Sequence, residues 1–150
     1  MPHVSLHSPV GDLTIFEADG ELVALEWGRA EVGAAPSPLL KDAKRQLEDY
    51  FDRKRRMFDL PLAPAGSPFQ RRVWDCMQRI PYGAVASYAA LARETSSGPR
   101  AVGTACGKNP LPIFIPCHRV VASGGIGGYS GGQGLPTKRT LLALEGYTLV

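Results

Sequence analysis

Residues 59–66 divide this chain into two parts. The segment reads Asp-Leu-Pro-Leu-Ala-Pro-Ala-Gly and has neither the alternation of a strand nor the spacing of a helix. Because its two prolines also restrict the backbone, we predict a linker here, with one lobe over residues 1–62 and another over residues 67–150. The 150 residues suffice for one well-buried core and a small second lobe.

Short strands and one helix are expected in the first lobe. Asp19-Gly20 lies between two apolar runs and supplies the positive φ angles of a tight hairpin turn. From residue 39 to residue 51, apolar side chains recur at helical spacing while charged side chains occupy the other face. The expected strands are residues 4–6, 13–18 and 22–27.

The second lobe is predicted to be mainly helical, which makes the whole chain an α/β (α+β) protein. Ser67-Pro68 is a capping residue followed by proline, which begins a helix that stops at residues 81–83. Ser87 caps a short helix over 88–94, and the polar break that follows leads into another short helix over 100–107. Two short helices joined by a tight turn containing glycine are a candidate helix-turn-helix.

Composition excludes several classes of protein. The apolar stretches are too short to span a bilayer, and the N-terminus has no basic segment followed by an apolar one, so we expect neither a membrane protein nor a secretory signal. Three cysteines at positions 76, 106 and 117 form neither a disulfide framework nor a CxxC metal pair. We therefore expect a reducing compartment, the cytoplasm or, in a eukaryote, the nucleus. Cys76 is interpreted as a small buried hydrophobic residue.

Charge is distributed unevenly along the chain. Residues 1–75 carry 10 basic and 12 acidic side chains, whereas residues 76–150 carry 7 basic and 2 acidic ones. A half with so few carboxylates suits a polyanion, because Lys and Arg that neutralise phosphates release counterions. A solvated surface of uneven composition is the alternative.

The most informative segment is Ile113-Phe-Ile-Pro-Cys-His-Arg-Val-Val121. A cysteine is a strong nucleophile as a thiolate, and a nearby cation or base favours that form. On a regular strand Cys117 and His118 point to opposite faces, so they would communicate through a bend or a bridging water. An orienting carboxylate for His118 must be Glu94 or Glu145, the two acidic residues of this half. Glu145 ends a helical stretch over 138–144, where the helix dipole disfavours a negative charge. A buried cysteine with a structural histidine remains the alternative.

Two further segments are unusual. Residues 101–107 form a helix with almost no side-chain bulk, which suits either tight helix packing or close approach to a groove of DNA, with Arg100 projecting at its start. Residues 123–134 contain seven glycines around Tyr129 and Ser130 but no phosphate-binding motif. They form either a mobile loop that closes over a ligand or a flexible linker.

Together these residues resemble the O6-alkylguanine-DNA alkyltransferases, the methylated-DNA–protein-cysteine methyltransferases. The resemblance is carried by Pro116-Cys-His-Arg-Val120, which is highly specific in that order, and it covers nearly the whole chain. It implies direct repair of O6-methylguanine by irreversible transfer of the alkyl group to the protein's own cysteine, once per molecule and without a cofactor. Further matching segments are Arg100-Ala-Val-Gly103, Asn109-Pro110, Gly128-Tyr-Ser-Gly-Gly132 and Leu141-Leu-Ala-Leu-Glu-Gly146, with Phe69-Gln70, Val73-Trp74, Ile80-Pro-Tyr-Gly83, Ser87-Tyr88 and, more faintly, 8–14 upstream.

The resemblance also implies roles for single residues. Cys117 is the acceptor, His118 its base through a water, and Glu145 the residue that orients the imidazole. The partner is double-stranded DNA bound through its minor groove, with the damaged base flipped into a pocket. The remaining catalytic residues are Asn109, which braces the network, and Tyr88, which donates a proton to the departing guanine. The DNA-binding residues are Arg100, which fills the vacated stack, Ala101, Thr104 and Arg119. The pocket residues are Pro112, Val120, Tyr129, Ser130 and Lys138.

Some features depart from the family or leave rivals open. Cys106 replaces a bulkier apolar residue and is interpreted as a packing or groove contact. The members of the family that have a zinc site use N-terminal cysteines and histidines, and here only His3 and His7 are present, so we expect no metal; we also expect a monomer. The rivals are a non-catalytic alkyltransferase-like protein that only binds lesions, a helix-turn-helix regulator, and a cysteine hydrolase. Retention of Cys117 disfavours the first, and the absence of an oxyanion motif disfavours the last.

Overall fold

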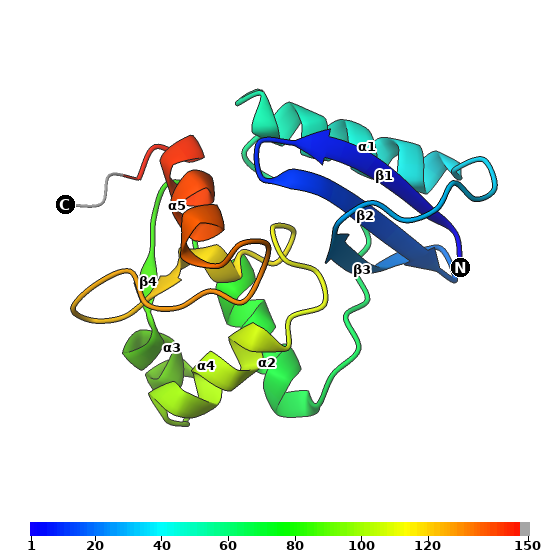
Figure 1. The fold of residues 1–150 in the computed structure, drawn as a ribbon. Helices are drawn as coiled ribbons and strands as arrows, with labels where there is room; N and C mark the ends of the chain where they lie inside the picture. Colours follow the sequence, from blue (N-terminus) through cyan, green and yellow to red (C-terminus); the bar gives the residue numbers. More distant parts are fainter. Residues whose placement is uncertain (148–150) are drawn as a thin grey trace. The chain divides into compact units, whose positions relative to one another are not determined.

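The computed structural model describes residues 1–147, and these fall into two compact units that divide between Ala65 and Gly66 (Figure 1). The first unit contains three strands and a helix, and residues 66–147 of the second contain four α-helices, one 3₁₀ turn and two very short strands. This is the mixed α/β fold expected from the sequence. No helix among residues 1–147 has both the length and the apolar character needed to cross a membrane.

An antiparallel sheet forms the first unit's framework. Strand β2 lies between β1 and β3, and the turn that joins β2 to β3 places Asp19 at φ 52° and Gly20 at φ 77°. Both angles are positive, as the Asp-Gly dipeptide predicted. The three predicted strands are confirmed with slightly wider bounds: β1 is His3–Ser8, β2 is Gly11–Ala18 and β3 is Glu21–Trp27.

Helix α1, Pro38–Phe51, covers one face of that sheet (Figure 1). It begins where the Ser37 hydroxyl accepts the backbone N–H of Leu40 at 3.1 Å. Its apolar face is fully buried, and each buried leucine contributes about 2 kcal/mol relative to an exposed one. The core of the unit comprises Leu6, Leu13, Ile15 and Leu25 from the strands and Leu40, Ala43, Leu47 and Tyr50 from the helix.

The predicted linker is partly structured. Leu62 forms a parallel bridge with Leu22, because the N–H of Leu22 donates to Pro61 and the N–H of Ala63 donates to Leu22, at 2.9 and 2.8 Å. The missing N–H groups of the two prolines are not needed for this bridge. A proline-rich segment can therefore extend along the first residues of β3, which the lack of sequence periodicity did not reveal.

Three helices build the core of the second unit. Helix α2, Pro68–Gln78, starts with a capping box between Ser67 and Gln70. Helices α3, Tyr88–Glu94, and α4, Pro99–Gly107, are joined by a four-residue turn and pack against each other, which is the predicted helix-turn-helix arrangement (Figure 1). The indole N–H of Trp74 donates to the carbonyl of Ala105 at 2.9 Å and ties α4 to α2.

The rest of the second unit brings the Cys-His-Arg segment to the helices. Strand β4, Ala86–Ser87, pairs in parallel with β5, Val120–Val121, and helix α5 spans Leu135–Leu144. The apolar runs on the two sides of Cys117 do not continue through it as a regular strand, and the bend that the sequence allowed is present. A 3₁₀ turn, η1, occupies Cys117–Arg119 directly before β5.

Candidate active site

The chain before the reactive thiol is held in an unusual path by Asn109. The Asn109 amide nitrogen donates to the carbonyl of Ile115 at 2.9 Å, and its oxygen accepts the N–H of Leu111 at 2.9 Å. Ile113, a β-branched residue, is forced to φ 75° in between. Strain of this kind persists only where the surroundings over-determine the backbone, as they do here.

Pro116 then reverses the chain so that Cys117 faces a cavity. At φ −80° and ψ 68° it forms an inverse γ-turn, closed by a 2.8 Å hydrogen bond from the N–H of Cys117 to the carbonyl of Ile115. The turn removes the opposite-face restriction that a regular strand would impose on Cys117 and His118. The cavity has a volume of about 440 Å³ and is lined by Tyr88, Gly103, Cys106, Gly107, Cys117, Gly128, Tyr129 and Ser130.

The Cys117 thiol is nearly inaccessible, with 8% of the residue exposed. Burial raises the pKa of Cys117, whereas hydrogen bonds with Asn109 and Tyr129 and the positive charge of Lys138 act in the opposite direction. Burial also raises the pKa of Cys106, to about 12, and the neighbouring Cys117 adds to this shift. The two thiols of the cavity therefore differ in the number of groups that stabilise a thiolate.

His118 and Glu145 form a buried pair. Nε2 of His118 lies 2.7 Å from Oε2 of Glu145, and neither side chain is exposed. Burial acts to raise the pKa of Glu145, but hydrogen bonds from His118 and Arg119 outweigh it and lower the pKa to about 2. Burial lowers the pKa of His118 below its ordinary value. A neutral imidazole beside an ionised carboxylate must carry its proton on Nε2 and its lone pair on Nδ1.

The other ring nitrogen of His118 is ready to accept a proton. Nδ1 is buried and has no hydrogen-bond partner among residues 1–147. A buried polar atom in this state normally marks a bound water or a functional group. The pair of residues thus presents a base whose tautomer is fixed by the carboxylate behind it.

Arg119 does not lie where DNA contact requires it to be. It is only 7% exposed, its Nε donates to Oε1 of Glu145 at 2.8 Å, and its Nη2 donates to Oε2 at 3.0 Å. Its Nη1 donates to the carbonyl of Ile80 at 2.7 Å. Because the guanidinium is buried and hydrogen-bonded inside the protein, the DNA contact that the resemblance implied for Arg119 does not fit the structure.

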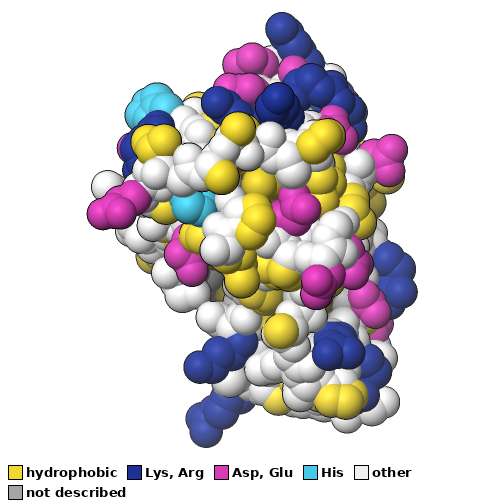
Figure 2. Space-filling model, turned by 90° about the vertical axis from the view of Figure 1, so that its right-hand side faces the viewer, with side chains coloured by type: hydrophobic (Ala, Val, Ile, Leu, Met, Phe, Trp, Pro, Cys, Tyr) yellow, Lys and Arg dark blue, Asp and Glu magenta, His cyan; other side chains and the backbone are white. Residues whose placement is uncertain are grey.

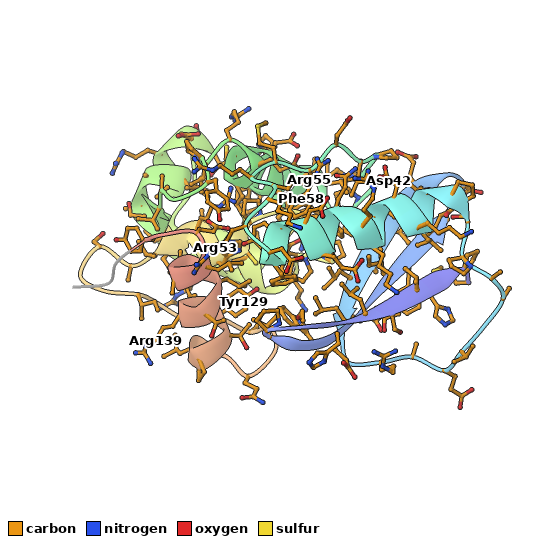
Figure 3. All side chains as sticks on the ribbon, turned by 90° about the horizontal axis from the view of Figure 1, so that it is seen from above. Asp42, Arg53, Arg55, Phe58, Tyr129 and Arg139 are labelled. Carbon is orange, nitrogen blue, oxygen red and sulfur yellow. The ribbon has the colours of Figure 1, made fainter. Side chains whose placement is uncertain are left out.

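Lys138 and Arg139 are neighbouring cationic residues of α5, and the helix buries the first and exposes the second. Lys138 is fully buried, and Nζ donates to the carbonyls of Val120, Ile126 and Gly128 at 2.7, 2.6 and 2.9 Å. Burial lowers the pKa of Lys138 to about 8. Arg139, labelled in Figure 3 with Tyr129, is exposed on α5. Lys138 therefore fastens the glycine-rich segment to the strand that follows Cys117.

The helix that follows the tight turn exposes the residues expected to face DNA. Arg100, Ala101 and Thr104 are all exposed on α4, and the Thr104 hydroxyl donates to the carbonyl of Arg100 at 3.1 Å. Figure 2 shows Lys and Arg side chains at both the upper and the lower end of the face that it draws. A smooth helix with a cation at its first turn suits contact with phosphates and a groove.

The cavity gathers some predicted pocket residues and adds others. Tyr129 and Ser130 line it as expected, whereas Pro112, Val120 and Lys138 are buried but are not in its lining. Cys106 and two glycines of α4 complete the wall, and sequence reasoning did not assign them to the pocket. Their spacing was the available signal, since residues 103, 106 and 107 share one face of a helix.

Fold and site together define a thiol-dependent transferase class in which a helix-turn-helix carries the reactive cavity. Residues 3–64 match the ribonuclease-like domain of 6-O-methylguanine DNA methyltransferase, and residues 68–147 match the DNA binding domain of that enzyme. The chain belongs to the 6-O-methylguanine DNA methyltransferase family. Its activity is direct DNA repair, by transfer of the alkyl group from O6-methylguanine in DNA to a cysteine of the protein.

Sequences and structures of relatives match this chain over nearly its whole length. It is 38% identical to the constitutive methylated-DNA–protein-cysteine methyltransferase of Bacillus subtilis, over 95% of this chain and 94% of that protein. It is 42% identical to the enzyme of that name from Mycolicibacterium paratuberculosis, over 94% and 90%. The crystal structure of Mycobacterium tuberculosis OGT in complex with DNA superposes with a TM-score of 0.85 at 37% identity, covering 97% of this chain and 92% of that one.

Proposed function

We propose that Cys117 is the alkyl acceptor, in the second of two functional lobes, and that each molecule acts once. The observation that carries this assignment is the buried Nδ1 of a neutral His118, which has no hydrogen-bond partner within residues 1–147, next in sequence to a thiol that lines the cavity. Burial raises the pKa of both cavity thiols, but hydrogen bonds with Asn109 and Tyr129 oppose the rise at Cys117, whereas the neighbouring Cys117 raises the pKa of Cys106 further, to about 12. The product at Cys117 is a thioether, which water does not cleave.

The proton of Cys117 leaves through a water to Nδ1 of His118. Glu145 accepts the Nε2 proton at 2.7 Å, which keeps the lone pair on Nδ1 and stabilises the imidazolium that forms. The thiolate then attacks the alkyl carbon, a new S–C bond forms, and the bond from that carbon to O6 of guanine breaks. Asn109 supports the thiolate by holding the turn before it.

The damaged base occupies the cavity after it rotates out of the duplex. Tyr88 and Tyr129 provide aromatic walls for a purine, and Ser130 provides a hydroxyl for its polar edge. Burial raises the pKa of Tyr88, so its phenol is protonated before the reaction and can donate that proton to the departing guanine. These groups recognise the base and its leaving group without reading the surrounding sequence.

Helix α4 enters the minor groove, and Arg100 fills the space that the base leaves. Its exposed residues are small, which allows close approach, and Arg100 is exposed in the first turn. We also infer that the protein acts as a monomer in the cytoplasm, where its cysteines stay reduced. The three cysteines at 76, 106 and 117 are all free thiols.

The deciding experiment is to mix the protein with a duplex that contains O6-methylguanine and to measure its mass before and after digestion. We expect one added methyl group per molecule, on the peptide that contains Cys117. Cys117→Ser should gain none, and Cys106→Ser should gain as much as the wild type. A methyl group found on Cys106, or repeated turnover by one molecule, would refute the assignment.

A further inference from the structure

Three ionisable side chains meet in one buried cluster, and one of them is an acid. The carboxylate of Glu145 is completely buried beside Arg119 and His118. It also follows the last residue of α5, where the helix dipole disfavours a negative charge. A buried carboxylate must have a cationic partner or take up a proton, because an unpaired charge is very costly there. Either Arg119 or His118 can supply that cation, and the choice decides the state of His118.

The geometry favours Arg119 as the partner. Its Nε and Nη2 donate to the two different oxygens of Glu145 at 2.8 and 3.0 Å, the paired arrangement that matches a planar guanidinium to a carboxylate. The third contact, from Nη1 to the carbonyl of Ile80 at 2.7 Å, fixes the plane of the guanidinium. A guanidinium stays charged at every physiological pH, whereas an imidazole does not.

His118 is left with one hydrogen bond and no need for a charge. It donates from Nε2 to Oε2 of Glu145, an oxygen that also accepts from Arg119. Burial lowers the pKa of His118, and the positive charges of Arg119 and Lys138 act in the same direction. The hydrogen bond and charge of Glu145 act in the opposite direction.

We propose that Arg119 is a positioning residue of the alkyl-transfer reaction, which supplies the counter-charge of Glu145 and so leaves Nδ1 of His118 free to accept the Cys117 proton. This inference rests on the proposed function, in which His118 is the base. Without Arg119, the proton that balances Glu145 has to reside in the His118–Glu145 pair. An imidazole that carries this proton holds hydrogens on both nitrogens and cannot act as a base.

The same arrangement keeps the charge constant during the first step. At rest, Arg119 and Glu145 cancel, and His118 and Cys117 are neutral. When the Cys117 proton moves to Nδ1, an imidazolium and a thiolate appear together, so the total charge of the site is unchanged. The thiolate loses its charge only when its sulfur bonds to the alkyl carbon and guanine departs with the electron pair.

Two measurements on the full chain test the proposal. Nitrogen-15 NMR reports the tautomer of His118 and the pH at which its ring takes up a proton. The rate of Cys117 alkylation by free O6-benzylguanine, measured as a function of pH, reports the fraction of His118 that is neutral and can act as the base. In the wild type we expect a neutral Nε2–H tautomer at pH 7 and a titration midpoint below 6.5. In Arg119→Met the midpoint should rise by about one pH unit or more, and the alkylation rate at pH 6 should fall about tenfold relative to its plateau.

Matched variants separate this role from a structural one. Arg119→Lys keeps the charge but not the paired contact, so its midpoint should lie between those of the wild type and Arg119→Met. Arg79 is an exposed arginine that donates a hydrogen bond to the Cys76 sulfur, and in Arg79→Met the His118 titration midpoint should equal that of the wild type. A folded Arg119→Met protein with an unchanged His118 midpoint and rate profile would overturn the proposal, as would a wild-type His118 protonated on Nδ1 at pH 7.

The outcome is decided even if Arg119→Met fails to fold, because the wild-type tautomer and the Arg119→Lys titration remain. Failure of the proposed function is a separate result. It would appear as a wild-type Cys117 without an alkyl group after exposure to the lesion, while the NMR measurement needs no transfer at all.

Discussion

Lys138 and Tyr88 meet at one carbonyl oxygen, that of Gly128. The ammonium of Lys138 donates to it at 2.9 Å and the phenol of Tyr88 at 3.4 Å, and the ammonium lies 5.9 Å from the centre of the Tyr88 ring. Lys138 comes from α5 and Tyr88 from α3, so Gly128, in the loop between β5 and α5, is held by side chains of two helices. The wall of the cavity at Gly128 therefore depends on a buried lysine that does not itself line the cavity.

Replacing Lys138 with methionine should loosen this wall. The carbonyls of Val120, Ile126 and Gly128 would each lose the hydrogen bond from the ammonium, and unmade hydrogen bonds in a buried site cost about 1–3 kcal/mol each. We expect the free energy of unfolding to fall by about 2–4 kcal/mol and Cys117 alkylation to slow by about tenfold or more. Urea denaturation and single-turnover alkylation measure the two effects. The neighbouring exposed Arg139→Met should change stability by less than about 0.5 kcal/mol, and an equal loss in both variants would contradict the bracing role of Lys138.

The buried acid–base pair predicts how stability depends on pH. The folded pKa of Glu145 is about 2, below its ordinary value of 4.5, so its contribution is complete above pH 4.5 and is lost as the pH falls toward 2. At most, this contribution is about 3 kcal/mol. The folded pKa of His118 is also lowered, so the unfolded chain takes up a proton first and stability begins to fall below pH 6.5.

Urea denaturation between pH 7 and pH 3 tests the contributions of Glu145 and His118 to the free energy of unfolding. The difference in unfolding free energy between the wild type and Glu145→Gln should not shrink between pH 7 and about pH 5 and should shrink below pH 4.5. If this difference stays constant down to pH 3, Glu145 is not held ionised by its neighbours in the way that its contacts with His118 and Arg119 indicate.

Local signals predicted most of the elements. Ser67 and Ser87 each cap a helix through a hydroxyl that accepts a backbone N–H, and the Asp19-Gly20 turn joins two strands, as their residue types indicated. Each of these features is specified within four residues, so the sequence contains all of the information. Strand β4 is only two residues long and exists because β5 pairs with it, which no local pattern reveals.

The site was harder to predict because its decisive contacts join distant residues. The turn at Cys117 arises from Pro116 and from Asn109 reaching Ile115, while the surrounding apolar run resembles a strand. Arg119 was expected to contact DNA because the resemblance to the alkyltransferases implied that role. Its actual partner, Glu145, lies 26 positions away, and only the fold brings the two together.

Arg100 should matter for duplex DNA and not for a free base. It is exposed in the first turn of α4, and in the proposed function it replaces the flipped base in the stack. Arg100→Ala should therefore slow repair of O6-methylguanine in a duplex by about tenfold or more, the effect of about 1.4 kcal/mol. Alkylation by free O6-benzylguanine should be nearly unchanged. Rates with both substrates, with Arg79→Ala as the control, provide the comparison, and equal losses on the two substrates would count against the stacking role.

Substitutions of Asn109 should separate its effect on the turn from its effect on the thiol. The Asn109 amide donates to Ile115 and accepts from Leu111, and its hydrogen bond with Cys117 lowers the pKa of that thiol. Asn109→Ala loses all three interactions. Asn109→Asp keeps the acceptor for Leu111 but places a negative charge beside the thiol, which must raise the pKa of Cys117 further.

Both variants should alkylate more slowly than the wild type at pH 7, and they should differ in their response to pH. The rate of Asn109→Asp should continue to rise at least about one pH unit beyond the point at which Asn109→Ala reaches its plateau, because a carboxylate opposes the thiolate. The rate of Cys117 alkylation by free O6-benzylguanine, followed from pH 6 to pH 10, measures this shift. Superimposable profiles for the two variants would mean that Asn109 acts on the backbone turn alone and does not influence the charge of the acceptor sulfur.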